Sequence, residues 1–401
     1  MISATKTITA EKLEQASKLL NEKGLDTWLL LTREGSDPAL PLLVGIRSVH
    51  KAAIFIRSNG EHLALSSVSD KGSYESTKLF KRVEVYEASM EEAFLKMIDE
   101  IKPVRLALNI SESDHLCDGL TQGLYLWLED VMGKDRLASL EVSSEELLKK
   151  LRSVKTESEL NHVQKAINYT TDIFEEVFQK MQCGMTELEI GQLFVDEMKV
   201  RGVGNGLGHP SDPPLVCIVR KGLAHRKPAN HKTEPGDIVI IDFSLRYMNY
   251  VSDIARTCYF LKPGEDKAPE DIQKAFDTAV KAITVSIEEL LPGKAGFEVD
   301  AAGRKVIEEG GYPTIRHSVG HQIGRATHDG GTILGPKRVP PRPEVEGIIE
   351  VGEIYAIEPT VIQDNNLPCI LVEENVLVTE HEPLILSKRQ TQLVLIPLAG
   401  N

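Results

Sequence analysis

Carboxylate side chains set inside apolar, strand-like stretches constrain the fold of this 401-residue chain more than any other feature. Asp242 and Asp253 bracket the stretch IDFSLRYMNYVSDI, Glu358 lies in YAIEPTVI, and Glu373 lies in ILVEENVLV. An isolated ionised carboxylate in an apolar setting is strongly disfavoured unless a cation, hydrogen-bond donors or a shared proton accompany it. We therefore expect a fold that brings these side chains to a common partner.

The stretch 241–254 predicts a tight β-hairpin with its turn in RYMNY. Opposed residues of a hairpin have a constant sum of numbers, so any loop with an even number of residues places Asp242 and Asp253 on the same face. Two carboxylates could then reach one centre. Aspartates near hairpins are also commonly solvated surface residues. The hairpin alone does not decide between a shared centre and two solvated side chains.

Three histidines fall close together in the stretch RHSVGHQIGRATHDGG: His317, His321 and His328 lie within twelve residues. The four glycines of this stretch disfavour a regular helix and favour a strand or loop whose backbone another group approaches closely. Clustered histidines suit metal ligation and proton transfer. A polar loop with incidental histidines would have the same pattern.

Aspartates, glutamates and a histidine together form a set of mostly oxygen ligands. Carboxylates that can bridge suit two divalent cations about 3.5 to 4 Å apart. Manganese is the favoured ion, and cobalt, zinc or iron would also suit the set. Glu374 has the opposite strand parity to Glu373, so we expect its side chain to face elsewhere.

The chain is expected to form two domains, with a boundary near residue 150. The first third alternates helical stretches, near residues 89–101 and 115–132 among others, with strands such as TWLLL and AAIFI, which predicts a small α/β domain with a mixed or parallel sheet. Capping boxes at Thr156 with Glu159 and at Thr186 with Glu189 then open two helices. Runs of strands beside these helices predict an α+β domain.

The composition and net charge of the chain limit the kinds of partner that it is expected to bind. A formal net charge of -14, from 60 acidic against 46 basic residues, gives no electrostatic footprint for nucleic acid or an anionic membrane. No apolar segment approaches the roughly 20 residues of a membrane span, and the stretch MISATKTITAEKLEQ lacks a secretory signal pattern. The five scattered cysteines have no C-x-x-C spacing and fit a reducing compartment, so we expect a cytoplasmic protein.

The motifs IDF…SD, HxxxH with a third histidine, IEP and VEEN, in that order, resemble the pita-bread metallopeptidases. These are methionine aminopeptidase, aminopeptidase P and prolidase, with the metal-free relative creatinase. The resemblance covers the whole chain, since LRSVKTESELNHVQKA is similar to the segment where the family's catalytic domain begins. It implies an α+β fold in which a smaller creatinase-like α/β domain, residues 1–150, precedes a pita-bread catalytic domain, residues 151–401.

The resemblance also implies a metal ligand for each strand motif. Asp242 would chelate one of two divalent ions, while Asp253 and Glu373 would bridge both. His321 and Glu358 would bind the second ion.

Further roles in catalysis are implied for residues around these ligands. Glu358 would accept the proton of the attacking water. His317 and His328 would contact the substrate and stabilise the tetrahedral intermediate. His225, in GLAHRKPANHKTEPGD, lies where the family places a substrate-binding histidine.

The chain also departs from the family pattern. Leu371 lies where prolidases and aminopeptidases P usually carry an arginine, two residues before the last glutamate, and Thr360 lies where glycine is common. Arg325 follows its glycine as in the methionine aminopeptidases. His209 and His231 match no family position and are expected on the surface or in packing contacts. These departures leave the choice of substrate open.

Three functions are compatible with these motifs. The first is a dinuclear-metal-dependent exopeptidase that hydrolyses Xaa-Pro bonds at the amino terminus of peptides or in dipeptides, as a homodimer by resemblance. The second is a creatinase- or ectoine-hydrolase-like enzyme that cleaves a non-peptide C–N bond of a small molecule. The third, a catalytically silent scaffold, would require a missing ligand or histidine, and none is missing.

Overall fold

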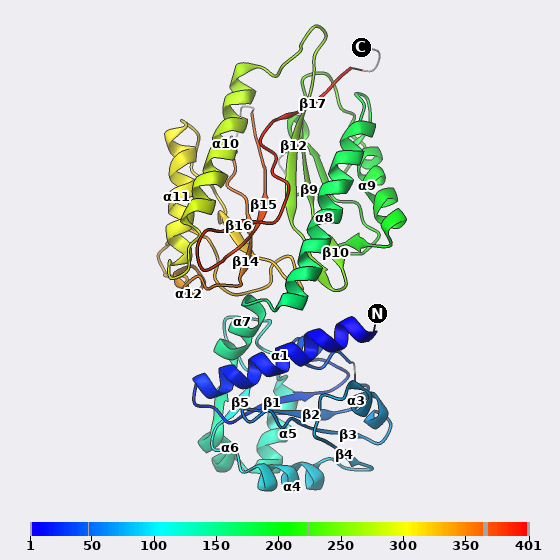
Figure 1. The fold of residues 1–401 in the computed structure, drawn as a ribbon, viewed down its shortest axis with the longest axis vertical. Helices are drawn as coiled ribbons and strands as arrows, with labels where there is room; N and C mark the ends of the chain where they lie inside the picture. The colour runs from blue at the N-terminus through cyan, green and yellow to red at the C-terminus, as the bar shows by residue number, and fades with distance from the viewer. Residues whose placement is uncertain (1, 47, 223–224, 364–367, 399–401) are drawn as a thin grey trace. The chain divides into compact units, whose positions relative to one another are not determined.

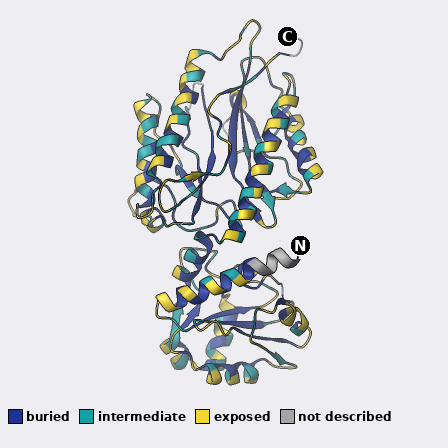
Figure 2. Cartoon of the chain, in the orientation of Figure 1, coloured by how far each residue is buried: buried dark blue, intermediate teal, exposed yellow. Residues whose placement is uncertain are grey.

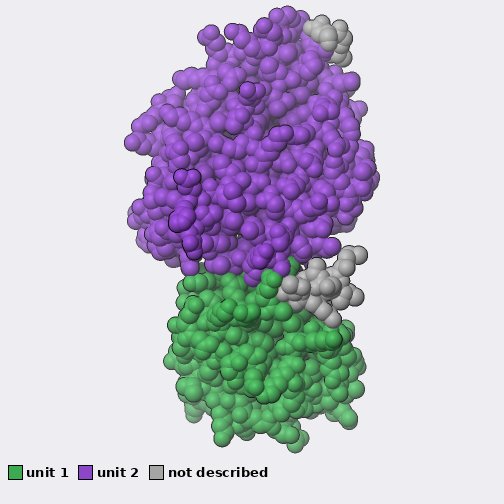
Figure 3. All heavy atoms as spheres, viewed as in Figure 1, with its two compact units in different colours: residues 1–152 green, residues 153–401 purple. Residues whose placement is uncertain are grey.

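The computed structural model describes residues 2–46, 48–222, 225–363 and 368–398. The chain divides into two compact units, residues 1–152 and 153–401 (Figure 3). Each unit encloses its own buried apolar residues (Figure 2). Each is therefore described by itself.

Unit 1 is built around a mixed sheet with the strand order β4-β3-β2-β1-β5-β6. β1 pairs antiparallel with β2 and parallel with β5, and every residue of β1 is buried, as expected for a strand covered on both faces. Leu30 belongs to the apolar cluster on one face of the sheet and Leu29 to the cluster on the other. The strands are β1 (Thr27–Thr32), β2 (Ala52–Arg57), β3 (Leu63–Ser67), β4 (Arg82–Tyr86), β5 (Leu106–Leu108) and β6 (Glu141–Ser143).

Helices cover this sheet (Figure 1). They are α1 (Ile2–Glu22), α2 (Leu40–Leu43), α3 (Lys71–Thr77), α4 (Glu91–Ile101), α5 (Gln122–Met132), α6 (Lys134–Leu140) and α7 (Glu145–Ser153). The helix expected over residues 115–132 begins only at Gln122, after Thr121 in an extended conformation. The preceding residues make contacts outside a helix: the Leu120 backbone N–H donates to the Asn109 carbonyl oxygen at 2.9 Å, and Gly119 packs closely against the Asp37 carboxylate.

Two pairs of helices flank the strands of unit 2, α8 with α9 on one side and α10 with α11 on the other (Figure 1). The helices are α8 (Glu157–Lys180), α9 (Glu187–Arg201), α10 (Glu270–Glu289), α11 (Gly296–Glu309) and the short α12 (Pro343–Glu346). Both capping boxes are confirmed: Thr156 and Thr186 each accept the backbone N–H three residues on, and Glu159 and Glu189 reach back.

The strands of unit 2 form separate sheets with the orders β11-β10-β7, β17-β12-β9-β8 and β13-β14-β15-β16. The first two contain β7 (Gly204–Asn205), β8 (Leu215–Ile218), β9 (Ile238–Phe243), β10 (Leu245–Tyr247), β11 (Tyr250–Val251), β12 (Ile254–Phe260) and β17 (Val394–Ile396). The third contains β13 (Gly320–Gln322), β14 (Ile354–Ile357), β15 (Glu374–Leu377) and β16 (Leu384–Ile385). A 3-10 turn, η1 (Val219–Lys221), follows β8.

The predicted hairpin is present. β9 and β12 pair antiparallel with Asp242 opposite Ala255, and β10 and β11 continue the hairpin to its tip. Met248 and Asn249 form a two-residue turn with φ of 49° and 68°. A positive φ at both residues is what a type I′ hairpin turn requires. Because this loop length is even, Asp242 and Asp253 lie on the same face, as expected.

All five cysteines are free thiols, and all but Cys183 are buried. The four buried ones serve as small core residues, as expected, and Cys183 is only partly buried. In the described ranges, no helix combines the length and the apolar character that a membrane crossing requires.

Candidate metal centre

The ends of neighbouring strands deliver the five predicted ligand residues. Asp242 lies in β9, and Asp253 directly precedes its partner strand β12. His321 lies in β13, Glu358 directly follows β14, and Glu373 directly precedes β15. Since β13, β14 and β15 are hydrogen-bonded in that order, the last three side chains come from one sheet.

Distances show that these side chains converge. Ligand atoms of Asp253, His321 and Glu373 all lie within 4.8 Å of one another. His321 Nε2 lies 3.6 Å from Asp253 Oδ2 and 3.7 Å from Glu358 Oε1. Asp242 lies on the same face of the hairpin as Asp253, and its charge raises the pKa of Asp253, Glu358 and Glu373.

The four carboxyl groups of this cluster create an electrostatic environment that favours bound cations. Burial raises the pKa of all four carboxyl groups, and in Asp253, Glu358 and Glu373 repulsion by neighbouring carboxylates raises it further. Within the described part of the chain, no lysine or arginine forms an ion pair with any of the four. Buried carboxylates without such partners are stabilised by metal ions.

His321 presents the nitrogen that a metal needs. Its Nδ1 lies 3.4 Å from the Gln322 carbonyl oxygen, so Nδ1 carries the proton and the Nε2 lone pair faces Asp253 and Glu358. Burial, and then His328, lower the pKa of His321 to about 3, which keeps the ring neutral. A neutral imidazole whose other ring nitrogen donates to a backbone carbonyl is the usual form of a metal-binding histidine. The donor set therefore fits divalent metal ions.

The other three predicted histidines surround the cluster. The ring centroid of His328 lies 4.3 Å from that of His321. His225 Nδ1 lies 3.9 Å from Asp242 Oδ2. Burial lowers the pKa of His317 and of His328, and the nearby His225 lowers both further. All the residues singled out for catalysis therefore share one neighbourhood.

His317 has both ring nitrogens engaged. Its Nδ1 lies 2.7 Å from the Ser318 carbonyl oxygen and must carry the proton there, so Nε2 accepts the hydroxyl hydrogen of Thr360 at 2.8 Å. Thr360 is buried and is the residue found where the resemblance favours glycine. Its role was not predicted from the sequence, because only the fold brings residue 360 to residue 317.

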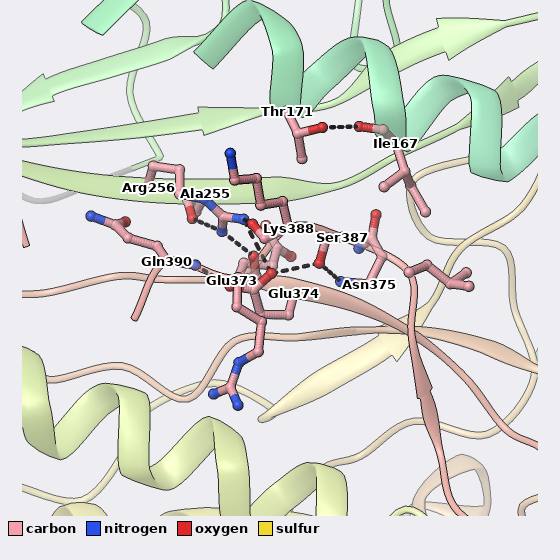
Figure 4. A network of polar contacts seen from close by, with 12 residues as sticks. Ile167, Thr171, Ala255, Arg256, Glu373, Glu374, Asn375, Ser387, Lys388 and Gln390 are labelled. Atoms are coloured by element: carbon pink, nitrogen blue, oxygen red, sulfur yellow. Dashed lines mark hydrogen bonds and ion pairs between the residues drawn. The ribbon is translucent and has the colours of Figure 1, made fainter. Parts of the chain in front are cut away.

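Glu374 faces away from the centre, as its strand parity predicts. It is buried and accepts hydrogen bonds from Arg256, from Ser387 and from the backbone of Gln390 (Figure 4). Arg256 Nη1 also donates to the backbone oxygen of Glu373 at 2.6 Å, so this network fixes the backbone of a predicted ligand. The sequence did not predict this role of Arg256. The one available signal was a single charged residue in the apolar strand IARTCYF.

The glycines of residues 317–331 serve contacts within the protein. A Cβ on Gly320 would lie 2.3 Å from the Ala356 carbonyl oxygen of the neighbouring strand, and one on Gly324 would lie 2.1 Å from Asp329 Oδ2. Asp329 is itself buried against Lys155, at 3.6 Å. The close approach expected from the glycines is therefore made by the chain's own groups.

Arg325, Arg316 and His225 are the residues that could replace the family arginine as a cation for the substrate. Of these, His225 has a contact with a predicted ligand, Asp242. The Arg325 guanidinium carbon lies 5.4 Å from the centre of the Tyr250 ring, with Nη1 3.5 Å from the Tyr250 hydroxyl. Arg316 is exposed. Leu371 is 3% exposed and belongs to the main apolar cluster of unit 2.

A cavity of about 370 Å³ adjoins the cluster, with Asp242 in its wall. Half of its lining residues are leucine or proline, including Leu207, Pro213, Leu215 and Pro228. Such a cavity is large enough for an amino-acid side chain and reaches the Asp242 carboxylate.

A cluster of buried carboxylates with a neutral histidine, with further histidines nearby and a partly apolar cavity beside it, is typical of metal-dependent hydrolases. The model of metallopeptidase family M24 matches residues 161–380, more than half of the chain. The chain belongs to this family of metallopeptidases, which implies divalent metal ions at the site.

Similar proteins cover nearly the whole chain. A Xaa-Pro dipeptidase of Pyrococcus horikoshii is 22% identical over 389 residues, which span 96% of this chain and 99% of that protein. The structure of an X-Pro aminopeptidase from Thermotoga maritima has a TM-score of 0.72 at 22% identity and covers 96% of this chain and 99% of that one. A Xaa-Pro dipeptidase from Bacillus anthracis has a TM-score of 0.74 at 20% identity, covering 97% and 100%. The fold is therefore the expected pita-bread fold preceded by a smaller α/β domain.

Proposed function

We propose that this protein is a dinuclear-metal-dependent exopeptidase that hydrolyses Xaa-Pro bonds at the amino terminus of peptides or in dipeptides. The convergence of Asp242, Asp253, His321, Glu358 and Glu373 carries the proposal. The printed names of the relatives, Xaa-Pro dipeptidase and X-Pro aminopeptidase, support the substrate class.

Each of the five residues has a proposed place in the metal centre. Asp242 would help to hold one ion, His321 and Glu358 would hold the other, and Asp253 and Glu373 would serve both ions. The Nε2 lone pair of His321, directed at Asp253 and Glu358, supports this division. When bound, two divalent ions acidify a water molecule and polarise the scissile carbonyl.

Glu358 is the proposed proton acceptor. Burial, and then the charge of Asp242, raise the pKa of its carboxyl group, which suits proton uptake closer to neutral pH. The Glu358 side chain keeps 14% of its surface exposed, so water can reach it.

His328 is the proposed hydrogen-bond donor to the oxyanion of the tetrahedral intermediate, since it adjoins His321 and is not tied to Thr360. His317, whose Nε2 already accepts a hydrogen bond, contributes by shaping the substrate site. His225, with 68% of its side chain exposed, binds the substrate beside Asp242.

Several finer features of this proposal come from the sequence. Manganese is the proposed ion because oxygen ligands dominate the site. Residues 1–150 are the proposed creatinase-like domain and residues 151–401 the catalytic domain. A homodimer in the cytoplasm, acting on peptides, completes the proposal.

A hydrolysis panel tests the function. Metal-stripped protein is assayed with and without Mn²⁺ on Xaa-Pro dipeptides, longer Xaa-Pro peptides, Met-peptides, creatine and ectoine. Mn²⁺-dependent cleavage of Xaa-Pro bonds is expected. Cleavage of creatine or ectoine with intact Xaa-Pro peptides would support the alternative, a hydrolase of a non-peptide C–N bond, which the relatives do not favour.

A further inference from the structure

Glu187, the first residue of α9, is a fully buried carboxylate away from the metal centre. It accepts hydrogen bonds from both terminal nitrogens of Arg226, with Nη1 at 2.6 Å. It also accepts the backbone N–H of Ile218 at 2.8 Å and of Ala229 at 2.9 Å. A buried carboxylate with this many donors is held in one geometry.

The residues that donate to Glu187 lie on both sides of His225 along the chain. Ile218 ends β8 before it, Arg226 follows it directly, and Ala229 lies four residues beyond. Glu187 therefore ties both ends of this segment, and the residue next to the histidine, to the start of one helix. His231 Nδ1 adds a contact with Glu187 Oε2 at 3.5 Å.

His225 needs such support. Its φ of 68° lies in the left-handed region, which a residue with a Cβ occupies only when its surroundings hold it there. Among the described residues, no hydrogen bond holds the imidazole itself, whose charged neighbour Asp242 lies at 3.9 Å. The place of the ring therefore depends on the backbone that carries it.

We propose that Glu187 and Arg226 are positioning residues that hold His225 over the metal centre. This inference rests on the proposed function, in which His225 binds the substrate. The competing interpretation is that the pair only stabilises the fold. The two differ in one respect: a positioning pair affects catalysis only while His225 is present.

A double-mutant cycle separates these interpretations. Arg226→Met, His225→Ala and the double variant are compared by kcat and KM on an Xaa-Pro peptide with Mn²⁺. We expect Arg226→Met to lower kcat/KM about tenfold in the native background and less than about twofold in the His225→Ala background. An equal loss in both backgrounds would overturn the proposal.

A conservative variant and a matched control accompany the cycle. Glu187→Gln keeps the shape and one acceptor oxygen, so it should lose less activity than Arg226→Met and provides a second test if that variant does not fold. The control is Arg220→Met, because Arg220 forms a comparable two-pronged pair with Asp237, with Nε–Oδ1 at 2.8 Å and Nη2–Oδ2 at 2.9 Å. In each background it should leave kcat/KM within about twofold of the value measured without the Arg220 substitution.

A readout without catalysis distinguishes failure of this inference from failure of the proposed function. In protein labelled with ¹³C at the histidine ring, the His225 signal is assigned by its loss in His225→Ala. Arg226→Met should shift or broaden that signal and leave the His321 signal in place. An unchanged His225 signal would overturn the inference, even if the native protein cleaved no Xaa-Pro peptide.

Discussion

Replacing Arg256 with methionine should destabilise unit 2 by about 3 kcal/mol, because it breaks a buried ion pair. Arg256 donates to the backbone oxygens of Glu373 at 2.6 Å and Lys388 at 2.7 Å, and to the Glu374 carboxylate at 3.1 Å (Figure 4). Removing one partner of a buried pair typically costs about 3 to 5 kcal/mol. The lower end applies because Glu374 keeps two donors, the Ser387 hydroxyl and the Gln390 backbone N–H.

Urea denaturation of metal-free protein measures this change. The matched control is Lys388→Met, which breaks the exposed ion pair with Glu175, where the lysine side chain is 73% exposed. That pair should contribute less than about 1 kcal/mol. Mn²⁺ affinity should also fall in Arg256→Met, since the backbone of Glu373 loses its donor. A loss of stability below about 1 kcal/mol in Arg256→Met would refute the reasoning.

The remaining predictions concern the site and its surroundings. His328→Ala should lower turnover about 100- to 1000-fold, and His317→Ala should lower it less, because His317 Nε2 already accepts a hydrogen bond from Thr360. Elemental analysis should show unchanged metal content in both variants, and loss of metal would make either histidine a ligand. Because the folded metal-free protein has raised carboxyl pKa values, it binds more protons than the unfolded chain and loses stability as pH rises above their ordinary values. The rise in Tm on adding Mn²⁺ should therefore be larger at pH 8 than at pH 5, and a constant rise would contradict this. Leu371 offers no cation for a dipeptide's carboxylate, so longer Xaa-Pro peptides should be cleaved about as well as dipeptides, and strict dipeptidase activity would contradict this. Leu371→Arg should lower the Tm, because residue 371 is buried in the core.

The sequence predicts the parts of the site that leave a local mark. Asp242, Asp253, Glu358 and Glu373 are polar residues in apolar strands, and strand periodicity alone predicts which way Glu374 faces. The two-residue turn fixes the face shared by the aspartates, as parity requires. These predictions need no knowledge of which segments meet.

The supporting contacts leave no such mark. Glu187 reads as an ordinary acidic residue in the first turn of a helix, where acids are common, yet it is fully buried and binds Arg226. Thr360 and Arg256 likewise acquire their partners only when distant strands pack. Tertiary packing, which local patterns do not encode, decides these roles.

The most direct test of the central claim is anomalous diffraction at the manganese edge from crystals of the Mn²⁺-loaded protein. We expect two peaks about 3.5 to 4 Å apart, in contact with Asp242, Asp253, His321, Glu358 and Glu373. Peaks bound by other residues, or none at these five when Mn²⁺ is shown to be present in the crystals, would contradict it.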